Sequence, residues 1–301
     1  MKTLAELGED GLLARIRSRF SRQKHSTLVV GPGDDAAISK LKPGHVLVST
    51  QDNLAEGAHF ELAWADFRRL AHKLLRINLS DLAAMGAVSP VGVLVSAGFP
   101  AKAPQDWALD FLDGLAEDAA RFKVPVLGGN LCRSQKVFFT LTALGQAKPA
   151  HIVRRSGARA GDLLAGIGPI GDAARGLADL KAGTSSGRFA KAFWEPEPQL
   201  KAGRILAEHG LATSMIDNSD GLMRSCDLLA QESGLGFRLS LARMQWEAAK
   251  ADGEDYGLVF TVKPKDWGRV EQLLPQAYRI GVMWTERRSS ARKPTGFDHF
   301  R

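Results

Sequence analysis

The chain has 301 residues, of which 45% are hydrophobic and 24% are charged, a balance that fits a soluble globular protein with one large domain or two ordinary ones. The formal net charge is +7, but basic residues cluster only at 15–24 and 287–293 and are not interleaved with aromatic residues. This distribution argues against a nucleic-acid partner. It fits instead the electrostatic steering of an anionic, phosphate-rich ligand.

Membrane insertion and secretion are not indicated. The longest apolar runs, such as Val91 to Phe99, fall far below the roughly 20 residues that a membrane helix needs, and the N-terminal residues have no apolar signal region. The two cysteines, Cys132 and Cys226, support neither a disulfide framework nor a thiolate zinc site. We therefore expect no membrane partner and a cytoplasmic location.

The first half of the chain alternates predicted strands and helices. A strand over 28–30 leads into the glycine-rich acidic hinge 31–35, so Asp34 and Asp35 are expected on a tight connection. The remaining elements are helices over 66–86 and from Pro104 to 122, and strands over 46–48, 91–96, 124–127 and 137–144. This pattern predicts an α/β domain over residues 1–149.

The second half begins with a turn at 156–162, followed by a strand at 163–166 and a further α/β series that runs to residue 283. We place the domain boundary near residue 150, which gives a C-terminal α/β domain over residues 150–301. The segment 181–187 is rich in glycine and serine and is expected to be a surface loop.

Two short motifs match familiar patterns but lack the required context. The segment 166–171 has the glycine spacing of a dinucleotide fingerprint, yet no acidic residue ends a second strand about twenty residues later, so we interpret it as a strand-to-helix turn. The segment 183–187 has nucleophile-elbow spacing without a preceding strand. No Gly-Lys-Ser/Thr phosphate loop occurs, and the histidines lack metal-ligand spacing.

Acidic residues gather in the predicted connections, with Asp52 just past a strand and Asp81 inside an apolar helical stretch that Asn78 or Ser80 would cap. Each acid has a structural alternative as a turn, cap or helix-start residue. Together they offer hard oxygen ligands that suit Mg²⁺ held through carboxylates and substrate phosphates, while Ser219 and helix-start amides suit phosphate oxygens. The series comprises Asp34, Asp35, Asp52, Asp81, Asp217, Asp220, Glu254 and Asp255.

These positions belong to motifs that follow one another through nearly the whole chain. The motifs are Gly33-Asp34-Asp35-Ala36, Asp52 with 54–60, Asn78 to Gly86, Arg155-Ser156-Gly157 with Gly161-Asp162, Asp217 to Leu222, Gly253-Glu254-Asp255-Tyr256, and Gly296 to Phe300. In this order they resemble the thiamine-monophosphate kinase family, within the superfamily named after aminoimidazole ribonucleotide synthetase. Several motifs in one order are far more specific than any single motif.

The resemblance implies a two-domain fold in which the N-terminal domain binds ATP and magnesium and forms a β-barrel with a second copy in a homodimer. It implies transfer of phosphate from ATP to thiamine monophosphate, with several Mg²⁺ ions between the two phosphate chains. Implied metal ligands are Asp35, Thr50, Gln51, Asp52, Asp81, Asn130, Asp217 and Asp220, of which Asp35, Asp81 and Asp220 would act in catalysis. Implied ATP contacts are Gly129, Asn130, Arg155 and Ser219, and implied thiamine contacts are His59, Glu254 and Phe297.

The chain departs from the family pattern at four places. Asn130 stands where the family has a metal-binding aspartate, and Gln51 stands where a hydroxyl residue is usual. Gly257 replaces a glutamate, and the stretch 241–253 is shorter than in the family. We expect these changes to weaken the affinity for metal, for substrate or for both.

The departures leave two alternatives to the kinase. One is a relative that binds nucleotide or thiamine phosphate without catalysis, which Asn130 and the shortened stretch favour. The other is a related ATP-using enzyme with a different acceptor, against which His59 and the segment 253–256 argue.

Overall fold

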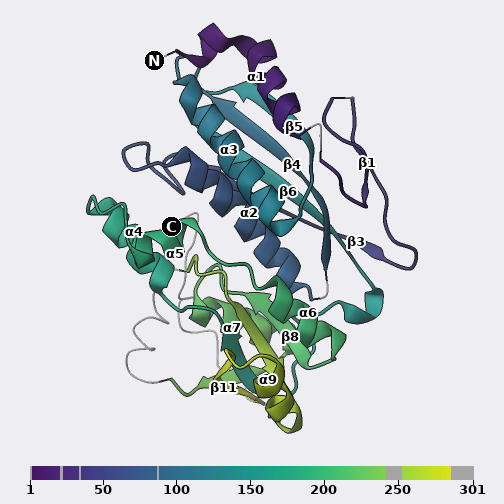
Figure 1. Cartoon of the computed structure of the whole chain (residues 1–301). Helices are drawn as coiled ribbons and strands as arrows, with labels where there is room; N and C mark the ends of the chain where they lie inside the picture. The colour runs from purple at the N-terminus through teal and green to yellow at the C-terminus, as the bar shows by residue number, and fades with distance from the viewer. Residues whose placement is uncertain (1, 21–22, 34, 87, 242–252, 286–301) are drawn as a thin grey trace. The chain divides into compact units, whose positions relative to one another are not determined.

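Figure 1 shows the computed structural model, which describes residues 2–20, 23–33, 35–86, 88–241 and 253–285. The chain divides into two compact units, and each is described here by itself. The first unit comprises Met1–Asn78 and Ser89–Ala147, and the second comprises Leu79–Val88 and Lys148–Arg301. The division falls inside helix α2 (Phe67–Ala84), so the end of this helix belongs to the second unit.

A four-stranded sheet forms the centre of the first unit, in the order β3 (Val46–Ala55), β6 (Phe138–Ala147), β4 (Ser89–Phe99) and β5 (Val126–Arg133). The pairs β3–β6 and β6–β4 are antiparallel. The pair β4–β5 is parallel and is joined through helix α3 (Gln105–Phe122), as a parallel crossover requires. Outside this sheet lie helix α1 (Leu4–Phe20) and a hairpin of β1 (Leu28–Val30) and β2 (Ile38–Ser39).

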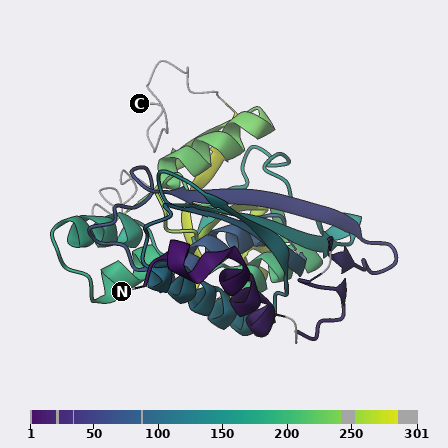
Figure 2. The ribbon, with the colours of Figure 1, turned by 90° about the horizontal axis from the view of Figure 1, so that it is seen from above.

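The helices α1, α2 and α3 lie on one face of this sheet (Figures 1 and 2). Phe139 of β6 stacks on Phe111 of α3, with ring centroids 3.9 Å apart, and meets Phe67 of α2 edge-on at 6.3 Å. On the opposite face the side chains are more exposed, including Leu47 at 53% and Leu94 at 39%. Alternation along each strand therefore separates a packed helix face from an open face.

The second unit contains a five-stranded sheet in which every neighbouring pair is antiparallel. Its order is β8 (Ala212–Asp217), β10 (Leu258–Val262), β7 (Leu163–Ile167), β11 (Tyr278–Trp284) and β9 (Gly236–Leu239). Besides the end of α2, the described residues of this unit form helices α4 (Asp172–Lys181), α5 (Arg188–Trp194), α6 (Leu200–Glu208), α7 (Leu222–Ser233) and α9 (Trp267–Leu273), with short 3₁₀ turns at Pro149–His151 and Pro264–Asp266.

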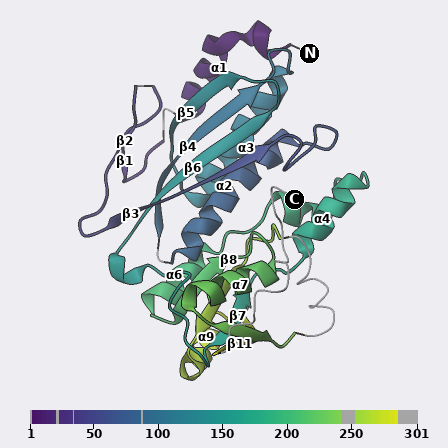
Figure 3. The same cartoon turned by 180° about the vertical axis from the view of Figure 1, so that it is seen from behind.

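Two apolar clusters, one on each face, hold this sheet between helices (Figure 3). On one face Phe260 and Met215 pack with Leu206 of α6 and Val270 of α9. On the other face, Leu164, Val259 and Ile280 pack with Cys226 and Leu229 of α7. The central strands β7 and β10 are thus buried on both sides, which explains their nearly continuous apolar sequences.

The mixed α/β, two-domain fold predicted from the sequence is confirmed, but two strand predictions need correction. Asp52 lies inside β3, paired with Leu141, and not just past the strand. The strand continues through its polar residues because β3 pairs with β6 along its whole length, from Val46 to Ala55. The strand predicted at 124–127 runs instead from Val126 to Arg133, across Gly128 and Gly129. Among the helices formed by described residues, none is long and apolar enough to cross a membrane.

Candidate functional site

The predicted site residues fall into two groups, one in each unit, and two of the predicted positions, Asp34 and Phe297, lie outside the described residues. The first unit carries Asp35, Thr50, Gln51, Asp52, His59, Gly129 and Asn130. The second carries Asp81, Arg155, Asp217, Ser219, Asp220 and Glu254.

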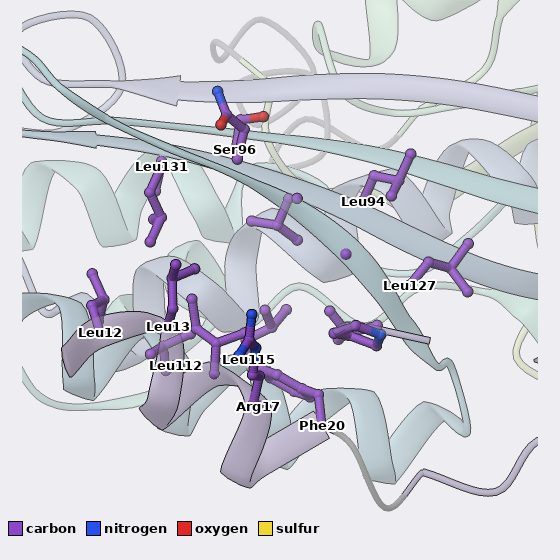
Figure 4. A pocket seen from close by; sticks show the side chains of 18 of the residues that line it. Leu12, Leu13, Arg17, Phe20, Leu94, Ser96, Leu112, Leu115, Leu127 and Leu131 are labelled. Atoms are coloured by element: carbon purple, nitrogen blue, oxygen red, sulfur yellow. The ribbon is translucent and has the colours of Figure 1, made fainter. Parts of the chain in front are cut away.

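A cavity of about 700 Å³ in the first unit is lined by residues of α1, α3, β4 and β5 (Figure 4). Its apolar part includes Leu12 and Phe20 of α1, Leu112 and Leu115 of α3, and Leu127 of β5. Its polar part contains four of the predicted site positions, which are Asp35, Gln51, Gly129 and Asn130. The lining therefore extends around the edge strand β5, from the apolar part on the helix face to Gln51 and Asn130 on the open face. An apolar wall with a few polar groups is typical of a small-molecule site.

Strand alternation separates the four polar residues predicted on β3 and β5. The Gln51 amide oxygen accepts a hydrogen bond of 2.8 Å from Thr142, and Asn130 lies opposite Ser96 in the β4–β5 register. These positions belong to the open face of the sheet. Because successive side chains point to opposite faces, Thr50 and Asp52 point to the helix face, so their side chains are not grouped with those of Gln51 and Asn130.

Gly129 is required by the close pairing of β4 and β5. A Cβ atom at this position would lie 1.8 Å from the carbonyl oxygen of Val95. At Gly128 the nearest atom to such a Cβ is 3.8 Å away. Because residue 129 is a glycine, β5 can lie this close to β4, and only backbone atoms of residue 129 line the cavity.

His59 is held in the turn that follows β3. Its Nδ1 atom accepts a hydrogen bond of 3.1 Å from the backbone N–H of Ala55, so the neutral ring carries its proton on Nε2. The neighbouring Phe60 is buried to 1% exposure and anchors the turn in the core of the first unit.

The second unit brings Asp217 next to two serines. Asp217 ends β8 and is 2% exposed, and its carboxylate accepts hydrogen bonds from Ser80 at 3.0 Å and from Ser219 at 3.2 Å. Asp81 follows Ser80 in α2, and Asp220 lies in the bend before α7. Asp217, Ser219 and Asp220 thus follow one another from the end of a strand into the bend that leads to a helix.

The bond between Ser80 and Asp217 was not predicted from the sequence. Asn78 or Ser80 was expected to cap a helix, but both lie inside α2, where Asn78 donates to the carbonyl of Leu74 at 2.8 Å. The Ser80 hydroxyl also donates to the carbonyl of Tyr256 at 3.3 Å. The sequence feature that could have indicated this contact is a serine next to an aspartate in an otherwise apolar helical stretch.

The segment 253–257 runs beside residues 218 and 219. The N–H of Glu254 donates to Ser219 at 2.6 Å, and the N–H of Tyr256 donates to Asn218 at 3.0 Å. Gly253 permits this approach, since a Cβ atom there would lie 1.8 Å from the Ser219 carbonyl oxygen. Glu254 is therefore grouped with Ser219 and Asp217.

The sequence groups Asp255 with the other acidic residues of the candidate site, but in the structure its carboxylate is bonded elsewhere. It is 4% exposed, and its carboxylate accepts hydrogen bonds from the N–H groups of Gly171 at 2.6 Å and Ala173 at 3.0 Å. Burial raises its pKa to about 6, because desolvation outweighs the lowering by these amide donors. The turn 166–171 therefore leads into a helix whose first N–H groups already donate to the carboxylate of Asp255. This agrees with our interpretation that the turn is not a dinucleotide site.

Arg155 lies on an exposed segment beside β8. The preceding residue, Arg154, accepts a hydrogen bond of 2.9 Å from Met215, and Gly157 adopts a φ of 124° where it passes Thr213.

In the described parts of the chain, no three His, Cys, Asp or Glu side chains converge closely enough to form a metal site on their own. Proteins usually bind Mg²⁺ through one or two carboxylates, with waters and substrate phosphates as the other ligands.

Comparisons with known proteins give consistent results. Residues 33–147 match the family AIR synthase related protein, N-terminal domain. The chain is similar to the thiamine-monophosphate kinase of Mycobacterium tuberculosis (strain H37Rv), with 32% identity over 94% of this chain and 91% of that protein. It is also similar in structure to the thiamine-monophosphate kinase of Stenotrophomonas maltophilia, with a TM-score of 0.81, 27% identity, and coverage of 92% and 94%. AaThiL complexed with AMPPCP and TMP gives a TM-score of 0.74, 25% identity and 98% coverage of both chains.

Proposed function

The chain belongs to the thiamine-monophosphate kinase family, and on this premise we propose that it transfers the γ-phosphoryl group of ATP to thiamine monophosphate and forms thiamine diphosphate. The observation that carries the proposal is the 32% identity along 94% of the chain to a kinase of that name. The similarity to a structure holding AMPPCP and TMP supports ATP as the phosphoryl donor.

The acceptor in this reaction is a phosphate oxygen, which is largely ionised near neutral pH. Catalysis therefore depends on positioning and charge neutralisation more than on a general base. Magnesium, when bound, would screen the repulsion between the two phosphate chains. We propose Asp81, Asp217 and Asp220 as its ligands in the second unit, with Asp81 and Asp220 in catalysis. The hard oxygens of Asp217, oriented by two serine hydroxyls, fit this role.

We propose that the first unit is the ATP and magnesium domain. Its cavity has the volume and apolar wall suited to a nucleoside, and Gly129 and Asn130 belong to the polar lining. Asp35, also in the lining, would act in metal binding and catalysis, while Thr50, Gln51 and Asp52 would act as further metal ligands. In the second unit, Arg155 and Ser219 would contact phosphate oxygens of ATP.

The thiamine end of the acceptor is proposed to contact His59 and Glu254. The backbone hydrogen bond from Glu254 to Ser219 supports this assignment, because it holds Glu254 next to Ser219, the proposed phosphate contact. Phe297 remains a prediction of the same kind.

We further propose a cytoplasmic homodimer. The open face of the first-unit sheet exposes Leu47 and Leu94, and apolar sheet faces of this kind are usually covered by another surface. The sheet of a second copy would cover it as a β-barrel. The free thiols Cys132 and Cys226 fit a reducing compartment.

Purified chain incubated with ATP, MgCl₂ and thiamine monophosphate tests the activity directly. Thiamine diphosphate should accumulate, as measured by chromatography, and Asp217→Asn should abolish most of it. Absence of thiamine diphosphate at every magnesium concentration would contradict the proposed kinase activity.

Two other results would identify an alternative. Calorimetric binding of ATP and thiamine monophosphate without product would indicate a non-catalytic relative, which the Asn130 substitution favours. ATP consumption only with another acceptor would indicate a different enzyme of the same superfamily.

A further inference from the structure

We infer that Asp255 is a positioning residue: its carboxylate fastens the segment 253–257 to the first turn of α4 and thereby holds Glu254 in the place where the acceptor binds. This inference rests on the proposed contact between Glu254 and the thiamine end of the acceptor. The hydrogen bonds of the Asp255 side chain go to Gly171, Ala173 and Asn218, none of which is a proposed metal or substrate ligand.

The first step concerns the start of α4, which has no cap from its own sequence. The N-cap residue is Gly171, with φ 81° and no side-chain hydrogen bond to the helix. Asp255, 84 residues away from Gly171 in sequence, supplies the missing acceptors. One carboxylate oxygen accepts the N–H of Gly171, and the other accepts the N–H of Ala173. Both oxygens thus bond the helix start, and the oxygen that accepts from Gly171 also accepts from the side-chain amide of Asn218 at 3.5 Å.

The second step concerns the backbone on either side of Asp255. Glu254 has φ 65° and Tyr256 has φ 52°, so two residues with side chains adopt the left-handed region that favours glycine. This conformation turns Asp255 inward to 4% exposure and leaves Glu254 partly exposed. Such a backbone persists only when its surroundings hold it.

The third step identifies what holds it. On one side, the N–H groups of Glu254 and Tyr256 donate to Ser219 and Asn218. On the other side, Gly257 packs so closely on the end of β7 that a Cβ atom would lie 2.5 Å from the Ile167 carbonyl oxygen. The Asp255 carboxylate joins the segment to Gly171 and Ala173, which follow β7 in the chain. Loss of the carboxylate would therefore loosen Glu254 and the start of α4 together.

Asp162 provides a matched control. It is also 4% exposed, and its carboxylate accepts hydrogen bonds from the N–H of Arg159 at 2.9 Å and from Thr213 at 2.7 Å. It lies just before β7, whereas Gly168 and Gly171 follow the end of that strand. Removing its charge tests the loss of a buried aspartate in the same unit without touching the segment 253–257.

The test compares the full chain with Asp255→Asn and Asp162→Asn. The amide of Asp255→Asn keeps one acceptor, but its NH₂ group replaces the other and faces one of the two N–H donors. We expect KM for thiamine monophosphate to rise about tenfold, and KM for ATP to change by less than about twofold, in Asp255→Asn. Asp162→Asn should leave both KM values at the wild-type level. If Asp255→Asn does not fold, Asp255→Ser, which retains a hydroxyl acceptor, takes its place.

Hydrogen exchange provides a readout that does not depend on activity. The amides of Gly171, Ala173 and Glu254 should exchange faster in Asp255→Asn than in wild type, and remain unchanged in Asp162→Asn. Faster exchange with an unchanged KM for thiamine monophosphate in an active enzyme would overturn the positioning role alone. If the wild-type chain neither binds nor phosphorylates thiamine monophosphate, the proposed function fails, and the role of Asp255 fails with it.

Discussion

The hydroxyl of Ser80 donates a hydrogen bond of 3.0 Å to the carboxylate of Asp217, although the two residues are 137 positions apart in sequence. Ser80 lies inside α2 and Asp217 ends β8, so the bond fixes the end of a helix to the end of a strand within the second unit. Burial of a carboxylate, here 2% exposed, is costly unless hydrogen-bond donors replace the water that it loses. The bond therefore prepares Asp217 for the metal-binding role proposed for it.

Ser80→Ala should raise the magnesium concentration needed for half-maximal activity by about tenfold, because residues that orient a metal ligand typically affect affinity on this scale. The measurement is a magnesium titration of turnover at saturating ATP. Ser225→Ala is the matched control, since this buried serine donates to the backbone carbonyl of Asp217 at 3.1 Å and not to its carboxylate. Equal effects of the two variants would show that the carboxylate contact is unimportant.

Asn130→Asp should lower the half-saturating magnesium concentration several-fold, because a carboxylate adds charge where the amide offers only a carbonyl oxygen. Asn53→Asp adds the same charge on the same sheet face but on the opposite edge strand, in register with Thr140. It should leave the titration unchanged. An unaltered titration for Asn130→Asp would contradict the loss of a ligand at this position.

Gly129→Ala should destabilise the protein by about 3 kcal/mol, since the added Cβ would lie 1.8 Å from the Val95 carbonyl oxygen and force β4 and β5 apart. Gly128→Ala, one residue earlier, meets its nearest atom at 3.8 Å and should change stability by less than about 1 kcal/mol. Urea denaturation of both variants measures the difference. Similar midpoints for the two would refute the close strand pairing.

Stability should depend on pH through Asp255, whose pKa burial raises to about 6. The native state then binds more protons than the unfolded state between about pH 4 and pH 6, so the free energy of unfolding falls as pH rises through this window. The loss is complete above the native pKa and amounts to about 3 kcal/mol. Asn cannot titrate, so wild type should lose stability relative to Asp255→Asn between pH 4 and pH 7. A difference that stays constant with pH would disprove the shift.

The elements of the fold were largely predictable because apolar periodicity determines them. Helix α2 was expected over 66–86 and is found at Phe67–Ala84, and β7 was expected at 163–166 and is found at Leu163–Ile167. The predictions that were wrong concern polar or glycine-rich strands. Asp52 and Gly128-Gly129 read as connections, yet pairing with β6 and β4 makes them strand.

By itself, the sequence determined the family, the succession of elements and the candidate acids, because ordered motifs and hydrophobic patterns are local properties of the chain. Only the tertiary structure determined in which direction the side chains of neighbouring candidate residues point. Strand alternation directs Gln51 and Thr50 to opposite faces, and the left-handed backbone at Glu254 and Tyr256 turns Asp255 inward and leaves its neighbour partly exposed. The direction of a side chain depends on contacts with residues far away in sequence, such as Gly171 and Ser219, and no local pattern records those contacts.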